Sequence, residues 1–545
     1  MAAATPARSP AATHSYTEAD IASVRLMVGL EVHVELATRT KMFSRSPNVA
    51  HKEFDGAEPN TLIDPVVLGL PGALPVMNKA AVEMSMMVGM ALGCSIAPFT
   101  RWDRKSYYYP DLPKNYQISQ YQLPLCFDGS VEMPVPAGGG GGGASAPDLP
   151  RRIGIIRAHL EEDAGKLLHE APGVMGGGGG GRPIDFSLVD LNRAGTPLLE
   201  IVTQPDFSSA DDVVLFAQHL RNICRFLGAT EGVMQKGHMR FEPNINTIIT
   251  LSDGRLAKTP IIEIKNLNSF KALRGAIEFE LADQPRRWLA DGREMGAGTK
   301  FTRGWDDQAM RTMIQREKED AHDYRYFPEP DLLPVTVDDT WREEVRARIP
   351  ELPSSRLARY RHDFNLGHKE AAALVDERDV CFFYERCVAE AQALGVDYPR
   401  AGKQAANMVL QSGAKRANER AVLASELGIT PAQIAAIIKL REDDTLTSTS
   451  ADELFGLLCE PGQSGIDAAQ LATTRGMMTV RDEGALEKWV DQAIAENAKV
   501  ADDVRSGKVA AAGRLVGVVM KLSGGTADAK VVREKVLAKL GQPIR

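Results

Sequence analysis

The chain has 545 residues, too many for one hydrophobic core, so two or three domains are expected. Its 44% hydrophobic and 25% charged residues are typical of a soluble globular protein, and its net charge of −8 argues against a general nucleic-acid binder. Residues 501–545 nevertheless carry nine Lys and Arg against four Asp and Glu, which makes this end +5 and the rest −13 and suggests a localised contact with phosphate.

The six cysteines contain no CxxC pair, so the sequence indicates neither a disulfide framework nor a thiolate zinc site and favours a reducing, cytoplasmic compartment. Residues 1–24 lack an apolar segment and are expected to be a disordered leader. The most apolar helical run, residues 79–99, is interrupted by Glu83 and several glycines. We therefore expect no membrane association.

Residues 28–36 alternate between apolar and chemically active side chains. The even positions are Val or Leu, and the odd positions include Glu31, His33 and Glu35. This period of two predicts a half-buried strand with carboxylates and an imidazole on one face. Such a face is either an ordinary polar surface or part of a site for a hard divalent cation.

A helix is predicted to begin after Asn78, which is a suitable N-cap. Two tracts of six glycines follow, at 138–143 and 176–181, and neither leads into the GK[ST] of a phosphate-binding loop. We interpret both as flexible surface insertions.

Short strands dominate the sequence up to about residue 340, with turns near Glu161 and Gly195 and one helix over 209–228. This pattern predicts an α+β fold with a largely antiparallel sheet, formed by residues 25–344. Helical spacing follows, with Pro350 and Pro353 in the linker. We expect a helical domain over 345–475 and a small helical tail module over 476–545.

Glu200 lies in a strand that is otherwise apolar on both faces. A buried carboxylate is costly unless a cation or a donor meets it, so it needs a partner. The acidic turn at Glu161, Glu162 and Asp163 and the strand of His33 could reach it. Several oxygen ligands and one imidazole suit Mg²⁺ better than zinc, although each could also be structural.

Cations and tyrosines alternate over residues 101–122. This combination suits a nucleotide phosphate with a base stacked nearby, and a tyrosine-rich structural loop is the alternative. The residues of this segment that we expect to bind the nucleotide are Arg104, Lys105, Tyr107, Lys114 and Tyr116.

Several long motifs together resemble the B subunit of the tRNA-dependent amidotransferase that makes Gln-tRNA and Asn-tRNA. They are VGLEVHVEL (28–36), DRKSYYYPDLPKNYQISQ (103–120), HLEEDAGK (159–166), SLVDLNRAGTPLLEIV (187–202), EIKNLNSF (263–270), DYRYFPEPDLLP (323–334) and, in the tail, LVGVVMKLSGGTAD (515–528). The first six stand in the family's order. The resemblance runs from about residue 25 to the C-terminus.

The resemblance implies a kinase-like cradle in which His33, Glu162 and Glu200 bind Mg²⁺, with Glu31 beside them. The strand pattern alone favours Glu161 over Glu162, because His159 and Glu161 share a face. We follow the motif match and take Glu162 as the ligand, in conflict with the strand pattern. In the family, ATP phosphorylates the side-chain carboxylate of misacylated Glu-tRNA or Asp-tRNA, and ammonia displaces the phosphate to leave an amide.

The family takes its ammonia from a separate amidase, the A subunit, which a small C subunit ties to the B subunit. Matching motifs make Lys265, Asn266, Asn268 and Arg325 candidates for the ammonia route. The tail module of the family grips tRNA, which makes its basic residues Arg514, Lys521 and Lys530 candidates for that contact. The sequence departs from the family at Glu242, where Asp is commoner, in its glycine tracts and in lacking a zinc knuckle.

Two other functions compete with that of a catalytic amidotransferase component. One is a non-catalytic tRNA-binding scaffold in which Glu31, His33 and Glu200 are structural. The other is a metal-dependent phosphohydrolase that works without tRNA. The sequence leaves open whether Gln-tRNA, Asn-tRNA or both are made.

Overall fold

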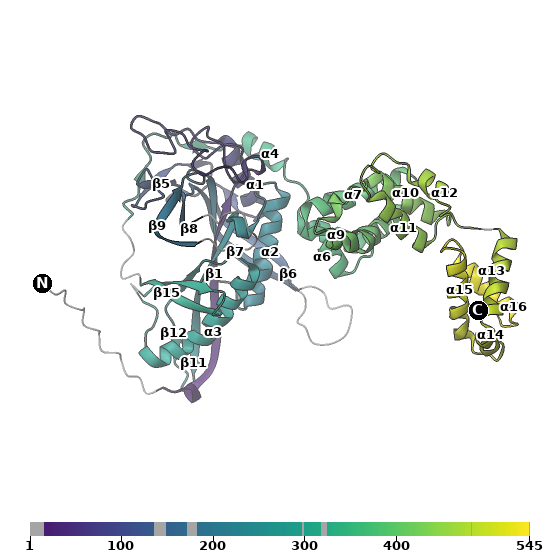
Figure 1. Ribbon diagram of the computed structural model, residues 1–545. Helices are drawn as coiled ribbons and strands as arrows, with labels where there is room; N and C mark the ends of the chain where they lie inside the picture. The colour runs from purple at the N-terminus through teal and green to yellow at the C-terminus, as the bar shows by residue number, and fades with distance from the viewer. Residues whose placement is uncertain are drawn as a thin grey trace. The chain divides into compact units, whose positions relative to one another are not determined.

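The computed structural model describes residues 16–135, 149–171, 182–296, 299–317, 324–480 and 482–543. Both glycine tracts and residues 1–15 of the expected leader lie outside the described residues. The chain divides into two compact units, Met1–Ser354 and Ser355–Arg545, which Figure 1 colours from purple to teal and from green to yellow. This division falls after the predicted boundary at residue 344, and the predicted boundary at 476 stays a prediction.

The first unit contains all of the named strands. They are β1 (Ile21–Glu35), β2 (Ser95–Ile96), β3 (Phe99–Thr100), β4 (Asp103–Ser106), β5 (Tyr116–Ser119), β6 (Cys126–Val135), β7 (Leu149–Glu162), β8 (Lys166–Ala171), β9 (Arg182–Asp190), β10 (Pro197–Thr203), β11 (Met239–Leu251), β12 (Leu256–Lys258), β13 (Ile262–Lys265), β14 (Phe301–Asp306), β15 (Arg311–Glu317), β16 (Phe327–Pro328) and β17 (Val335–Thr336).

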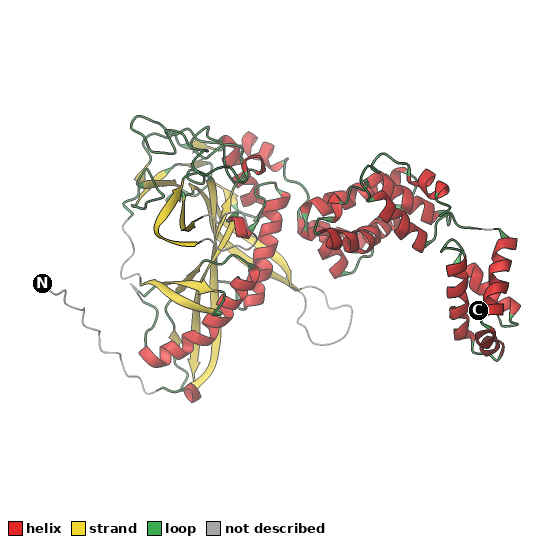
Figure 2. Ribbon diagram, viewed as in Figure 1, coloured by secondary structure: helices red, strands yellow, loops and turns green. Residues whose placement is uncertain are grey.

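Four α-helices accompany these strands among the residues that the structure describes, and the second unit is helical (Figure 2). The helices of the first unit are α1 (Lys79–Ala91), α2 (Ala210–Phe226), α3 (Phe270–Asp291) and α4 (Asp339–Arg346). After α5 (Pro353–Asp363), which crosses the division, follow α6 (His368–Asp376), α7 (Arg378–Ala393), α8 (Tyr398–Asn407), a π-helical segment (Met408–Gly413), α9 (Ala414–Arg420), α10 (Pro431–Glu442), α11 (Ser448–Leu458), α12 (Ala468–Thr474), α13 (Glu483–Glu496), α14 (Ala498–Arg505), α15 (Ala512–Leu522) and α16 (Ala529–Lys539).

Strand β1 is the centre of the main sheet, whose order is β15-β14-β13-β11-β1-β10-β7-β5-β4-β16. Every neighbouring pair that the register defines in this sheet is antiparallel except β13 and β14, which are parallel. The predicted α+β fold with a largely antiparallel sheet is confirmed. No helix among the described residues is long and apolar enough to cross a membrane.

The predicted alternation in β1 is confirmed and decides which face of the sheet is chemical. Val28, Val32 and Val34 are fully buried. They pack with residues of α1, α2 and α3 in one hydrophobic core, which also includes Phe216 and Leu273. The helices therefore cover the apolar face, and the odd-numbered side chains of β1 project from the other face, which we call the polar face.

Helix α1 begins where the sequence predicts, because the Asn78 side chain accepts hydrogen bonds from the backbone of the first turn. Helix α4 belongs to the first unit and not to a linker. Its Trp341 indole donates a hydrogen bond of 2.9 Å to Glu83 of α1, and Arg348 lies 2.9 Å from the same carboxylate. This contact accounts for the late division of the chain.

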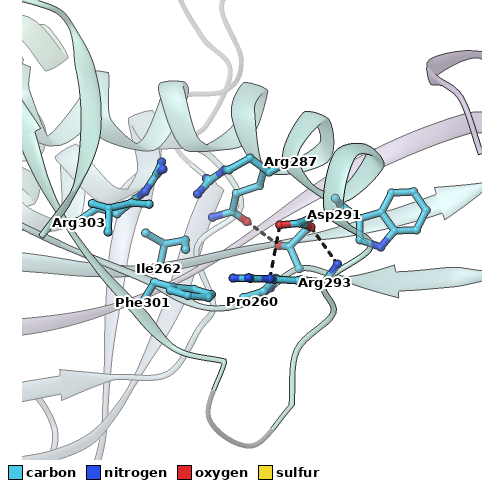
Figure 3. A pocket seen from close by; sticks show the side chains of 11 residues that line it. Pro260, Ile262, Arg287, Asp291, Arg293, Phe301 and Arg303 are labelled. Carbon is cyan, nitrogen blue, oxygen red and sulfur yellow. Dashed lines mark hydrogen bonds and ion pairs between the residues drawn. The ribbon is translucent and has the colours of Figure 1, made fainter. Parts of the chain in front are cut away.

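A buried ionic network joins α3 to the edge of the sheet. Glu280 is fully buried and accepts hydrogen bonds from Arg303 (3.2 Å), Thr312 (2.5 Å) and Arg287. Arg287 and Arg303 also line a hollow between α3 and the strands, beside Phe301 (Figure 3), and Trp288 lines it too. Removal of one partner from such a network leaves unpaired charge in the core.

We expect Glu280→Leu to lower the free energy of unfolding of the first unit by about 3–5 kcal/mol, because both arginines lose a buried carboxylate. Urea unfolding followed by tryptophan fluorescence measures this change. The matched control is Glu278→Leu on the exposed side of the same helix, which should change stability by less than about 0.5 kcal/mol. Equal effects of the two substitutions would refute the role of the network.

Candidate functional site

Three side chains form a row across neighbouring strands on the polar face. His33 of β1 stands opposite Glu200 of β10, and Glu200 stands opposite His159 of β7. Nε2 of each histidine lies 3.7 Å from the same Glu200 Oε2. The partly buried Glu200 carboxylate, for which the sequence predicts a partner, thus has an imidazole on each side.

His33, Glu161 and Glu200 can offer ligand atoms within 4.8 Å of one another, so the structure brings these three residues together as a possible metal site. Glu162 is not part of this group. Its carboxylate pairs with Lys114 and accepts a hydrogen bond of 3.0 Å from the backbone N–H of Ile118. The geometry therefore favours Glu161, the alternative from the strand pattern, because successive residues of a strand point to opposite faces.

The carboxylates around His33 stabilise positive charge at this position, as the pKa of its imidazole shows. Burial acts to lower the pKa of His33, but the carboxylates of Glu200 and Glu242 outweigh it and raise this pKa to about 9. Burial lowers the pKa of His159 to about 4 and raises that of Glu161 to about 7. Nδ1 of each histidine is buried without a hydrogen bond to any described residue. Protonated His33 therefore supplies positive charge that a metal ion could also bring, and the donor set fits Mg²⁺.

A second acidic group lies beside the first on the polar face. Glu31, Glu242 and Glu263 can place carboxylate oxygens within 4.8 Å of one another. Lys265 Nζ lies 2.7 Å from Glu242 and 3.0 Å from Glu263, and Lys300 Nζ lies 3.3 Å from Glu263. Two ammonium groups therefore already balance much of this charge. The side-chain amide of Asn244 donates to Glu31 at 3.0 Å.

An arginine bridges the two strand ends that carry the first group. Arg240 of β11 stands directly opposite His33, and its guanidinium contacts Glu35 at 3.1 Å and Asp163 at 2.9 Å. Burial and the neighbouring Asp163 raise the pKa of Glu35 to about 8, whereas Arg193 and Arg240 overcome burial and lower the pKa of Asp163 to about 2. Asp163 thus remains the charged partner of Arg240.

The predicted nucleotide-binding residues divide between the two faces of the sheet. Lys105 pairs with Gln117 in the register of β4 and β5, and Ser119 of β5 pairs with Glu161, so Lys105 shares the face of Glu161. Its ammonium lies 5.2 Å from the ring centroid of Tyr324 and acts electrostatically on Glu161 and Glu200.

Tyr107 also belongs to the polar face, since its hydroxyl donates to Gln117 at 3.4 Å. Arg104, Lys114 and Tyr116 do not. Arg104 lies over the Tyr116 ring at 4.3 Å and pairs with Glu329 at 2.6 Å. Lys114 forms an ion pair with Glu162, whose carboxylate also accepts from the backbone N–H of Ile118. Of the predicted set, only Lys105 and Tyr107 face the metal-ligand candidates.

The residues expected to line the ammonia route differ in their surroundings. Lys265 lies in the second acidic group, whereas Asn266 and Asn268 are exposed in the following turn. Arg325 is exposed between Tyr324 and Tyr326. The tail residues Arg514, Lys521 and Lys530 are exposed on α15 and α16. Their assignments to ammonia and tRNA stay predictions.

Several residues of this site were not assigned from the sequence alone, among them His159, Arg240, Glu263 and Lys300. His159 carried a signal, because it shares a strand face with Glu161. Arg240 and Glu263 carried a weaker one, as charged residues on predicted strands. Nothing in the local sequence of Lys300 indicates that it reaches Glu263.

Comparison with known proteins agrees with the motifs. The family model described as the GatB/GatE catalytic domain matches residues 26–343, and that described as the GatB domain matches residues 392–540. A protein of Thermomicrobium roseum is 41% identical over 95% of this chain and 99% of its own length. Proteins of Caldicellulosiruptor saccharolyticus (39%; 93% of this chain, 97% of the relative) and Synechococcus elongatus (40%; 94% and 97%) are similar.

All three relatives are named as the B subunit of an aspartyl/glutamyl-tRNA(Asn/Gln) amidotransferase. The catalytic-domain match alone covers more than half of the chain. It spans most of β1 and every later strand to β17, and with them the whole group of metal-ligand candidates. The chain belongs to the family of amidotransferase B subunits.

Proposed function

We propose that this chain is the component of a tRNA-dependent amidotransferase that activates the side-chain carboxylate of misacylated Glu-tRNA(Gln), Asp-tRNA(Asn) or both with ATP. Ammonia then converts the activated group to an amide. The observation that supports this most directly is the group of His33, Glu161 and Glu200, with the Lys105 ammonium on the same face. Family membership supplies the tRNA substrate and the use of ATP.

The chemistry requires two displacements. A carboxylate oxygen of the aminoacyl side chain attacks the γ-phosphorus of ATP, the bond from γ-phosphorus to the bridging oxygen breaks, and ADP leaves. The nitrogen of ammonia then attacks the acyl carbon, phosphate leaves with the C–O electron pair, and nitrogen loses a proton. Activation is needed because phosphate is a far better leaving group than oxide, and cations lower the barrier by balancing charge on the transferring group.

His33, Glu161 and Glu200 would hold Mg²⁺, with Glu31 beside them. Bound Mg²⁺ supplies charge neutralisation to the transferring phosphoryl group. Lys105 is well placed to bind the ATP phosphates, because its ammonium is held near the ring of Tyr324 and faces the carboxylates. Glu162 is left out of the ligand set because Lys114 neutralises it on the opposite face.

The remaining parts of the reaction come from partners. An amidase, the A subunit, delivers the ammonia, and a small C subunit joins the A subunit to this chain. The candidates for the ammonia route on this chain are Lys265, Asn266, Asn268 and Arg325. The basic tail, through Arg514, Lys521 and Lys530, is to contact tRNA phosphates. The exposure of the three tail residues supports this assignment.

We expect Glu200→Gln to lower the rate of Glu-tRNA-dependent ADP formation by about 100-fold or more. The rate is compared in complexes co-purified with their partner subunits. The amide keeps the shape of the side chain but loses the charge that faces both histidines. ADP release is measured from ATP and Mg²⁺ with and without Glu-tRNA, and Glu278→Gln serves as the exposed control. A folded Glu200→Gln complex that retains this activity would make the chain a tRNA-binding scaffold.

We expect Mg²⁺ binding to release about one proton near pH 8, because a metal can bind only the neutral imidazole of His33 and Glu161 has already lost most of its proton at this pH. The pKa of His33 is raised to about 9, so the proton is present below this pH and the apparent affinity for Mg²⁺ should rise as pH increases towards 9. Titration calorimetry in buffers of different ionisation enthalpy counts the protons.

The control for this titration is His362→Gln, because the imidazole of His362 is exposed and lies in the helical unit. It should release the same proton as the wild-type chain. Binding of Mg²⁺ with no proton release at pH 8 would exclude His33 as a ligand.

A further inference from the structure

We propose that Arg240 is a positioning residue that sets the spacing between His33 and Glu161 by bridging the carboxylates two residues beyond each of them. This inference rests on the proposed function, since it concerns the same metal-ligand candidates. Arg240 contacts neither Glu161 nor Glu200 in any described hydrogen bond or ion pair, so it would act through Glu35 and Asp163.

The strand register places this bridge next to the ligands. Glu35 follows His33 by two positions on β1, and Asp163 follows Glu161 by two positions after β7. Strand β10 lies between β1 and β7, so these two strands are not neighbours in the described sheet. Arg240 comes from β11, on the other side of β1. Its side chain links the end of β1 to the turn after β7 by contacting Glu35 and Asp163.

The chemistry of the bridge demands a guanidinium. The two contacts use different nitrogens, Nη1 for Glu35 and Nη2 for Asp163, in the fixed fork that only arginine provides. Both carboxylate side chains are largely buried, with 3% and 9% of their surface exposed. A lysine would retain the charge but could not hold both acids in the same geometry.

A second arginine fixes the turn on which Asp163 lies. Arg193 Nε lies 3.7 Å from Asp163 and donates to the carbonyl of Ala164 at 3.0 Å, while its Nη2 donates to the carbonyl of Gly165 at 2.6 Å. Arg193 therefore holds the turn after Glu161 to the loop that precedes β10. The side chain of Arg240 ties it to β1, and so to His33.

The test is the affinity of the full chain for Mn²⁺, used as a spectroscopic probe of the Mg²⁺ site, for wild type and Arg240→Lys. We expect Arg240→Lys to weaken Mn²⁺ binding by about 10- to 100-fold, the usual effect of losing support behind metal ligands. In the complex with its partner subunits, the Mg²⁺ concentration for half-maximal ADP formation should rise by a similar factor. The KM for Glu-tRNA should stay within about twofold.

The matched control is Arg303→Lys. Arg303 is also a buried arginine that serves two acids, Glu280 at 3.2 Å and Asp283 at 3.5 Å, but it lies against α3, in the hollow of Figure 3. Arg303→Lys should lower the melting temperature at least as much as Arg240→Lys while leaving Mn²⁺ affinity unchanged. If both variants weaken Mn²⁺ binding in proportion to their loss of folded protein, Arg240 is merely structural and the proposal fails.

A second variant guards against misfolding of Arg240→Lys. In Glu35→Met, Arg240 loses its acceptor at this position but keeps its charged partner Asp163, so no buried charge is left unpaired. We expect weaker Mn²⁺ binding at an unchanged melting temperature, and unchanged binding would overturn the proposal. If His33→Ala binds Mn²⁺ as tightly as the wild-type chain, the metal site itself is refuted. This result separates failure of the proposed function from failure of this inference.

Discussion

The first unit depends on balancing buried negative charge on one face of a central sheet. Carboxylates from β1, β7, β10, β11 and β13 project from the polar face, while the opposite face of the same strands packs against helices. Buried carboxylates are tolerated only when cations meet them. Here the cations are His33, Arg240, Lys265 and Lys300, each close to at least one acid.

At one place on the polar face, the positive charge that balances the carboxylates can be lost by deprotonation. Around the second acidic group and the Glu35–Asp163 pair, the positive charge comes from lysine and arginine, which keep it at every physiological pH. Next to Glu200 it comes from His33, with Lys105 acting from farther away, and His33 would lose its proton to solvent when a metal ion binds its nitrogen. The group of His33, Glu161 and Glu200 is therefore the place where we propose that a metal ion replaces a proton, with the permanent charges beside it.

The helical unit has a different organisation. Its last part has its own hydrophobic core, which includes Val490, Leu515, Val519 and Val536. The basic side chains Arg514 and Lys521 lie on the outside of the same helix that buries Leu515 and Val519. The buried carboxylates and the exposed basic tail thus lie in separate compact units, so that each charge pattern is solvated or paired without weakening the other.

The sequence alone determined the strand of residues 28–36, the helix after Asn78, the α+β class and, through long motifs, the family, because each depends on local periodicity, capping or chain order. The strand pattern favoured Glu161 whereas the family motif implied Glu162, and only the pairing of β1, β10, β7 and β5 places Glu161 with His33 and Glu200. Local pattern also did not show which of Arg104 and Lys105 faces that group. Those choices depend on which strands pair and in what register. The bridge from Arg240 to Glu35 and Asp163 joins residues that are far apart in the chain, so only the tertiary structure brings it into view.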